Sequence, residues 1–129
     1  MDEPRWVPDM VVEVIHFDQL REHGGLPGVR DRGALESALA RPRNKGTYGP
    51  ATDLAALASA YGYGLVKSHP FNDGNKRVGF MVVVVFVELN QHQLNASEDD
   101  VVKVFLALAA GDLSEDELAS WLRSHITPA

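Results

Sequence analysis

The chain has 129 residues, 45% of them hydrophobic, and a formal net charge of −6 at pH 7. This length and composition fit one compact domain that spans residues 1–129 and buries its own core. The chain contains no cysteine, which excludes a disulfide framework, a thiolate zinc site and a cysteine nucleophile. The negative charge argues against direct binding of nucleic acid, because nonspecific binding depends on a broad surplus of Lys and Arg.

The chain has the sequence pattern of a cytoplasmic protein without a membrane anchor. Residues 1–6 lack the basic stretch and following apolar run of a secretory signal. The longest apolar run, residues 78–87, has about ten residues, roughly half of what spans a bilayer. That run therefore predicts a core helix.

The first third of the chain predicts two helices. One begins at Pro8-Asp9 and ends at Gly24, although β-branched residues leave a strand possible at 11–15. His16 lies on this segment, and a lone His among apolar neighbours is more often a core residue bonded to backbone than a ligand. Asp31 caps a second, short helix that Pro42 ends.

The following segments complete an all-α bundle of about six helices. Residues 43–50 are rich in Gly, Pro and Asn and predict an exposed loop or hairpin. Thr52 or Asp53 then caps a helix to about Ser68, and a second apolar helix follows over residues 75–90, where the valine run 82–85 makes a strand the alternative. Residues 91–95 predict a polar connector. The last two helices begin at Ser97 and at the capping box of Ser114 and end the bundle.

Residues 69–77, between the two most apolar helices, read His-Pro-Phe-Asn-Asp-Gly-Asn-Lys-Arg and do not resemble a core. A helix that begins near Gly74 directs its unpaired N–H groups and positive dipole end at this loop, which makes an anion site. His69 carries an imidazole, the kind of side chain that can accept a hydroxyl proton at neutral pH. Asp73 is a hard oxygen ligand for Mg²⁺. Asn75 and Arg77 can hydrogen-bond phosphate oxygens, as phosphoryl or nucleotidyl transfer requires.

Two other interpretations of this loop stay open from chemistry alone. In the first, the loop is an ordinary helix start in which His69 and Asp73 bond only to each other or to backbone. In the second, it belongs to an HD-type metal phosphohydrolase, which needs more His and Asp ligands than the loop offers. The remaining histidines lack paired spacing around it; they are His16, His23, His92 and His125.

Residues 69–77 resemble the motif of the Fic/Doc family at every position: His-Pro-Phe, a variable residue, Asp or Glu, Gly, Asn, Gly or Lys, Arg. Residues 24–31 and 35–42 are similar to the N-terminal half of the death-on-curing (Doc) branch, so the resemblance covers residues 16–95. It implies a compact helical bundle with the motif between two central helices. It also implies a general base at His69, a Mg²⁺ ligand at Asp73, and an ATP phosphate site at Gly74 and the residues after it.

Lys76 distinguishes the branches of the family. Most adenylyl-transferring members have Gly there, which leaves room for phosphates against bare backbone N–H groups. A Lys resembles the Doc branch, in which the nucleotide binds in reverse and its γ-phosphoryl group is delivered. Lys67 stands where that branch has a basic residue and is expected to contact phosphate, although a solvated position is an equal alternative. The rival functions are a protein adenylyltransferase and a noncatalytic antitoxin-binding module.

The resemblance further implies the toxin of a toxin–antitoxin pair. Its expected substrate is a Ser or Thr of a protein, a translation elongation factor, whose modification inhibits translation. No Ser/Thr-x₃-Glu-x₂-Gly/Asn inhibitory pattern occurs in the chain, so a separate antitoxin protein is the expected inhibitor. Residues 43–50 are expected to form a flap that holds the target, with Thr47 and Tyr48 as docking residues.

Overall fold

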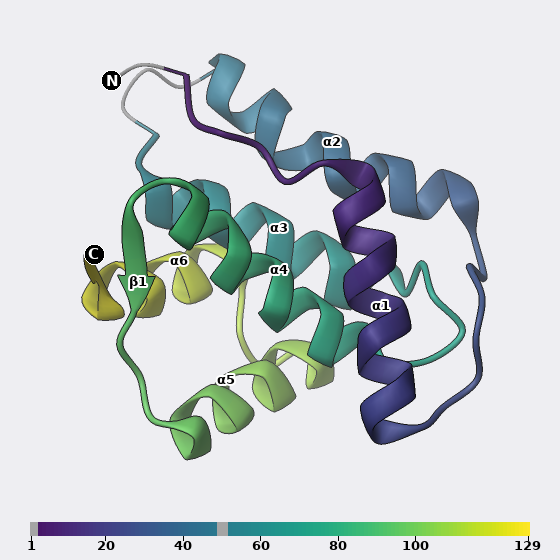
Figure 1. Ribbon diagram of the computed structural model, residues 1–129. Coiled ribbons are helices and arrows are strands. Elements are labelled where there is room, and N and C mark those ends of the chain that lie inside the picture. Colours follow the sequence, from purple (N-terminus) through teal and green to yellow (C-terminus); the bar gives the residue numbers. More distant parts are fainter. Residues whose placement is uncertain (1–2, 49–51) are drawn as a thin grey trace.

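Helices α3 (Leu54–Ser68) and α4 (Asn75–Leu89) lie at the centre of the structure, and the other helices surround them (Figure 1). The computed structural model describes residues 3–48 and 52–129. Glycines let the two central helices approach closely. A Cβ at Gly79 would lie 2.8 Å from Cγ2 of Val66, and one at Gly62 would lie 3.0 Å from Cγ2 of Val83. This contact fixes the end of α3 beside the start of α4.

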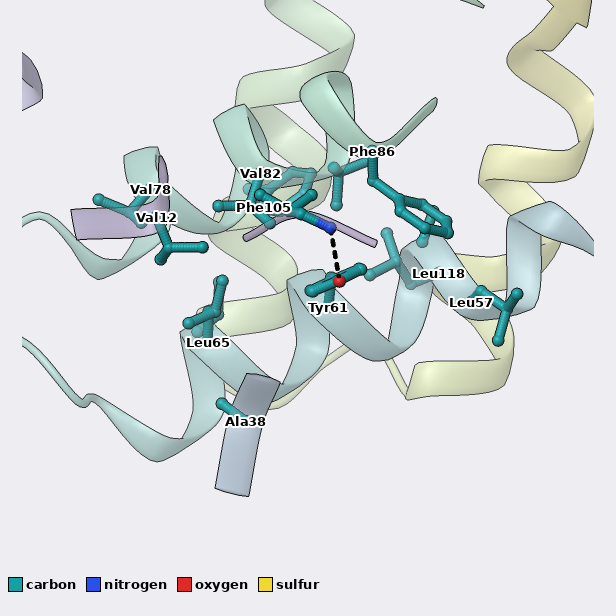
Figure 2. Packing of buried hydrophobic residues seen from close by; sticks show 14 of the residues in the cluster. Val12, Ala38, Leu57, Tyr61, Leu65, Val78, Val82, Phe86, Phe105 and Leu118 are labelled. Carbon is teal, nitrogen blue, oxygen red and sulfur yellow. Dashed lines mark hydrogen bonds between the residues drawn. The ribbon is translucent and has the colours of Figure 1, made fainter. Parts of the chain in front are cut away.

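Four more helices cover the central pair. They are α1 (Asp9–His23), α2 (Arg32–Tyr48), α5 (Glu98–Ala110) and α6 (Glu115–His125). Buried aromatic and aliphatic side chains from these elements form one core around Tyr61, Phe86 and Leu118 (Figure 2). The hydroxyl of Tyr61 accepts a hydrogen bond from the N–H of Val7 over 3.1 Å, the dashed line of Figure 2. Burial raises the pKa of this phenol.

The all-α expectation with six helices is confirmed. The valine run 82–85 is helical, as are residues 11–15, so neither strand alternative holds. Val82 and Val83 are fully buried against α3. Packing of an apolar face therefore outweighs the β-propensity of valine. Among the described ranges, 3–48 and 52–129, no helix is long and apolar enough to cross a membrane.

A small sheet replaces the polar connector expected at residues 91–95. Strand β1 (His92–Leu94) pairs antiparallel with β2 (Ile126–Pro128), and Gln93 lies opposite Thr127. The partner strand comes from the far end of the chain, after α6. Local sequence patterns contain no information about a pairing with such a distant segment, which explains why only a polar connector was expected.

The prediction of a loop at residues 43–50 is wrong for residues 43–48, because α2 continues through Pro42 to Tyr48. Gly49 and Pro50 lie outside the described residues, as do the side chains of Thr47 and Tyr48. A proline inside a helix costs about 3 kcal/mol, because it removes one hydrogen bond and crowds the preceding turn. Contacts elsewhere in the structure must offset that cost.

The contacts that hold the second half of α2 come from other elements. Glu115 at the start of α6 pairs with Arg41, and its Oε2 lies 2.9 Å from Nζ of Lys45. A Cβ at Gly46 would lie 3.6 Å from side-chain atoms of both Trp6 and Leu57, so this turn packs directly on its neighbours. Tertiary contacts therefore override the local helix-breaking residues.

Candidate active site

The loop between α3 and α4 is bounded by two residues in the left-handed region. His69, which follows the last residue of α3, has φ 48° and ψ 57°. Gly74, which precedes α4, has φ 79° and ψ 14°. The expected helix start at Gly74 is thus confirmed. The two left-handed residues reverse the chain within a few residues. The His69 side chain is exposed, Pro70 and Phe71 are buried, and Asn72 and Asp73 are exposed.

Phe71 anchors the loop in the core, with an exposed fraction of 1%. Its ring stacks on His16 of α1, with ring centroids 3.9 Å apart and planes 16° apart. His16 is buried, and its Nε2 lies 3.0 Å from the carbonyl oxygen of Asp73. The interpretation of His16 as a core histidine bonded to backbone is confirmed. It supports the loop from beneath.

Asn75 holds the loop from the first turn of α4. Its Oδ1 accepts a hydrogen bond from the N–H of Phe71, and its Nδ2 donates to the carbonyl of Phe71, both over 3.0 Å. Nδ2 also lies 3.4 Å from Nδ1 of His69. Because the amide is buried and engaged by the loop backbone, its direct role in the structure is to shape the loop and steady the imidazole. A contact from Asn75 to phosphate stays a prediction.

Arg30, in the segment between α1 and α2, fixes the end of α3. Its Nε donates to the carbonyl of His69 over 2.7 Å, and its Nη2 donates to the carbonyl of Ser68 over 3.0 Å. A guanidinium at these terminal carbonyls satisfies acceptors that the helix leaves open and opposes the negative end of its dipole. Sequence reasoning did not single out Arg30. The signal was the similarity of residues 24–31 to the Doc branch.

Residues 24–31 lie directly against the motif loop. Val29 forms an isolated antiparallel bridge with Phe71. The N–H of Asn72 donates to the carbonyl of Gly28 over 3.1 Å, and the N–H of Arg30 donates to the carbonyl of Pro70 over 2.8 Å. The two loops, far apart in sequence, therefore form one backbone-bonded unit, which is visible beyond the ends of α1 and α3 in Figure 1.

The carboxylate of Asp73 is oriented by backbone groups of both loops. Oδ1 accepts from the N–H of Gly74 over 3.0 Å, and Oδ2 accepts from the N–H of Leu26 over 3.3 Å. A Cβ at Gly25 would lie 2.9 Å from Oδ2, so the first loop must be glycine there to approach. Within residues 3–48 and 52–129 no group of three His, Asp or Glu residues could hold a metal by itself. A single exposed carboxylate suits Mg²⁺, which commonly takes one or two protein carboxylates and completes its shell with phosphates and water.

The motif side chains surround a cavity of about 290 Å³, called here the phosphate cavity. Its lining residues are His69, Asn72, Asp73, Gly74, Asn75, Lys76, Arg77 and Ala109. Lys76 is exposed and Arg77 half-buried, and Nε of Arg77 is buried without a hydrogen-bond partner in the described part of the chain. The start of α4 has no acidic residue in its first turn and no side-chain cap. The cavity thus combines two cations, a helix N-terminus and one carboxylate, which suits a polyphosphate with Mg²⁺.

The structure does not bring every predicted residue to this cavity. Lys67 is not among its lining residues; its Nζ lies 3.6 Å from the Cβ position of Gly111, at the C-terminal end of α5. Thr47 and Tyr48 end α2 next to the N-terminal half of α3, as the contact of Gly46 with Leu57 indicates. The cavity lies at the opposite end of α3. Helix α3 has 15 residues, so its two ends are about 20 Å apart.

Known proteins are similar to this chain over the region that builds the cavity. Residues 7–87 match the model of a family described as the Fic/DOC family. The chain is 29% identical over 109 residues to the protein kinase doc of Escherichia phage P1, and this alignment covers 84% of the chain and 86% of that protein. The matched region runs from the segment before α1 into α4 and includes both loops that build the cavity.

Proposed function

The chain belongs to the Fic/Doc family, and we propose that it is a Doc-like toxin that transfers the γ-phosphoryl group of ATP to a Ser or Thr hydroxyl of a protein. The observation that carries the proposal is the phosphate cavity, where the exposed imidazole of His69 stands beside Asp73, Lys76 and Arg77. These groups supply a base, a metal ligand and two phosphate-binding cations. The name and similarity of the phage P1 protein kinase doc support the same reaction class.

The cavity residues divide the reaction between them. His69 accepts the proton of the target hydroxyl as its oxygen attacks the γ-phosphorus, and the bond from that phosphorus to the β–γ bridging oxygen breaks to release ADP. Arg77 and the N-terminus of α4 stabilise charge on the phosphate oxygens. Asp73 would hold Mg²⁺, which neutralises phosphate charge when bound. Asn75 and Arg30 position the base through the contacts described above.

Lys76 favours phosphoryl over adenylyl transfer. It lines the phosphate cavity in the first turn of α4, at the position where a Gly would leave open backbone for leaving phosphates. A compact ammonium on a flexible stem occupies that space and attracts the phosphates of a nucleotide bound the other way round. Protein adenylyltransferase remains the second candidate because it uses the same base and metal ligand.

Residues 24–31, called here the docking loop, suit the target-docking role better than residues 43–50. The docking loop is hydrogen-bonded to the loop that carries His69, and its Leu26 is 63% exposed next to Asp73. A segment held along this loop would bring a hydroxyl to the imidazole. A helical backbone such as that of residues 43–48 has its N–H groups engaged and offers no edge for strand addition. Docking at Thr47 and Tyr48 would require α2 to unwind.

The antitoxin and the target follow from the resemblance to the Doc branch. An exposed apolar stripe on α1 supports a protein partner: Met10, Val14 and Phe17 are 76%, 52% and 63% exposed and recur at helical spacing. Such a stripe suits an apolar segment of an antitoxin. A translation elongation factor is the proposed target, and inhibition of translation is the proposed result.

The test is transfer from radiolabelled ATP to translation factors in the presence of Mg²⁺. Label in the γ position should enter the target, and label in the α position should not. Lys76→Gly should reduce γ-transfer, and Lys103→Gly, which removes an exposed Lys of α5 away from the cavity lining, is the control for a lost surface charge. Transfer of α-label by the parent chain would establish adenylyl transfer instead. Growth arrest by a His69→Ala chain would establish the noncatalytic binding module.

A further inference from the structure

The peptide group between Asp73 and Gly74 is bonded at both of its polar ends. Its N–H donates to Oδ1 of Asp73 over 3.0 Å, and its carbonyl oxygen lies 3.0 Å from Nε2 of His16. The N–H and C=O of a trans peptide lie in one plane and point in opposite directions. The orientation of this plane therefore decides whether the N–H meets the carboxylate that is the proposed Mg²⁺ ligand.

His16 holds the carbonyl end of that peptide from α1. A carbonyl oxygen can only accept a hydrogen bond, so Nε2 of His16 must carry the proton. His16 is only 6% exposed, which leaves little access for water to replace it. Its ring stacks on Phe71, with centroids 3.9 Å apart, and this contact fixes the plane in which Nε2 donates.

Gly74 leaves the same peptide free to adopt a second orientation. Its φ of 79° lies in the left-handed region, and glycine populates positive and negative φ about as readily. A flip of peptide 73–74 changes ψ of Asp73 and φ of Gly74 and leaves the rest of α4 in place. The flip exchanges the directions of N–H and C=O. Oδ1 of Asp73 would then lose its donor and face a carbonyl oxygen.

We infer that His16 is a positioning residue whose hydrogen bond to the Asp73 carbonyl prevents this flip. The bond thereby keeps the Asp73 carboxylate oriented for Mg²⁺ and keeps the flipped carbonyl away from phosphate. This inference rests on the proposed function, because binding of ATP with Mg²⁺ is where the orientation matters. His16 does not line the phosphate cavity, so it acts only through the peptide it holds.

A role in packing alone does not account for a histidine at this position. A phenylalanine or leucine would fill the site and contact Phe71 without the cost of burying a polar ring. Leu20, one turn later on α1, shows the apolar alternative. Its Cδ2 lies 3.9 Å from the Cβ position of Gly74, at the same distance as Cδ2 of His16. Both residues support Gly74 from below, but only His16 can select the direction of the carbonyl.

The first test is a matched pair of amides at position 16. The amide nitrogen of His16→Gln lies near the place of the imidazole Nε2, whereas His16→Asn is one methylene shorter and cannot reach the Asp73 carbonyl. Calorimetry in Mg²⁺ should give an ATP affinity within about twofold of the parent for His16→Gln and about tenfold weaker for His16→Asn, the order of one buried hydrogen bond. Transfer should fall in the same order.

Val12→Ala is the control for lost packing on α1. Val12 is fully buried one turn before His16, on the same face of the helix. The variant should lower the melting temperature and leave ATP affinity unchanged. If His16→Asn behaves in the same way, with a lower melting temperature and the affinity of the parent, His16 is merely structural and the inference is overturned.

The second test changes the other end of the flip. An alanine at position 74 has room, because the nearest atom outside the local backbone, Nη2 of Arg77, would lie 3.7 Å from its Cβ. Alanine disfavours positive φ, so Gly74→Ala should favour the flipped peptide and weaken ATP binding in Mg²⁺. Combined with His16→Asn it should add little, because both changes act on one peptide. Full additivity of the two losses in binding free energy would overturn the inference.

The third test needs no nucleotide. The ¹⁵N chemical shifts of the His16 ring should show a proton on Nε2 in the parent chain, and an unprotonated Nε2 would overturn the inference. The binding results also separate the inference from the proposed function. If the parent binds ATP in Mg²⁺ and His16→Gln and His16→Asn bind it equally well, only the inference fails. If the parent does not bind ATP, the proposed function fails and the inference fails with it.

Discussion

The N-terminal ends of α6 and α4 show two opposite ways to begin a helix. At α6, the Ser114 hydroxyl accepts from the N–H of Glu117, and the Glu117 carboxylate accepts from the N–H of Ser114. The first turn carries Glu115, Asp116 and Glu117, three acids at the positive end of the dipole. The capping box pairs open N–H groups of the helix end, and the acids oppose the positive end of its dipole, so this helix end needs no outside ligand.

At α4 the same positions carry the opposite chemistry. Gly74 precedes the helix without a side-chain cap, no acid occupies the first turn, and Lys76 and Arg77 are there instead. The first side chain, Asn75, bonds back to the loop. The comparison teaches that one helix end is completed for stability, whereas the other is left positively charged for an anion. Changes at the two ends should therefore affect different properties.

The largest expected effect is on activity, at the α4 end. His69→Ala should reduce phosphoryl transfer by about 10²–10⁴-fold, because the general base is lost, while ATP binding and the melting temperature stay close to those of the parent. Single-turnover transfer and calorimetry measure the two properties. His23→Ala removes an exposed histidine of α1 and serves as the control. Equal transfer rates for the two variants would show that His69 is not the general base.

Asn75→Ala should affect both properties, because this residue joins the helix start to the loop. It leaves the buried N–H and C=O of Phe71 without partners, which costs about 1–3 kcal/mol. Denaturant unfolding should show that loss, and transfer should fall because the imidazole loses its neighbour. Asn72→Ala should be milder, because the Asn72 side chain is exposed and its amide donates to the carbonyl of Pro27. If the free energy of unfolding of Asn75→Ala equals that of the parent, Asn75 does not stabilise the loop.

Ser114→Ala should affect stability alone. Loss of an N-cap hydroxyl costs roughly 1 kcal/mol, and α6 contributes no lining residue to the phosphate cavity. Urea unfolding and the transfer assay on the same preparation measure both properties. Ser120→Ala, an exposed serine within α6, is the control. A loss of transfer without a loss of stability would mean that the two helix ends are coupled.

The smallest expected effect is a pH dependence at the α6 end. Burial acts to raise the pKa of Glu115, but the hydrogen bonds and charges of Arg41 and Lys45 outweigh it, so the pKa is lowered. A carboxyl group with a lower pKa in the folded than in the unfolded protein stabilises the fold at pH values above the unfolded pKa of about 4.3. This stabilisation is lost as the pH falls through the folded pKa. The free energy of unfolding should therefore differ between parent and Glu115→Gln by about 1 kcal/mol or less at pH 7. The difference should shrink as the pH falls below the unfolded value of about 4.3, and a difference that stays constant with pH would contradict the assignment.

Local signals predicted the helices and the motif loop well. Thr52 or Asp53 was expected to cap one helix, and Ser97 and Ser114 two others. Asp53, Ser97 and Ser114 each accept a hydrogen bond from a backbone N–H in the first turn of the helix. The helix start at Gly74 was also expected and is observed. All of these features depend on residues within a few positions of one another, which is the range that a sequence pattern reports.

Long-range contacts account for what the sequence did not predict. Residues 43–48 stay helical because Glu115, far along the chain, pairs with Arg41 and Lys45. The position of the docking loop beside His69 depends on Arg30 and on a bridge between Val29 and Phe71. Neither contact has a local pattern, since each joins residues whose proximity follows only from the packing of the helices.

The left-handed backbone of His69 has a consequence for selection. A residue with a Cβ is held there at a cost of roughly 1 kcal/mol relative to glycine. Among chains selected only for resistance to heat, those with Gly at position 69 should therefore be enriched, and these chains lack the imidazole. Thermal stability and transfer activity therefore favour different residues at position 69. Retention of His69 would indicate selection for the activity.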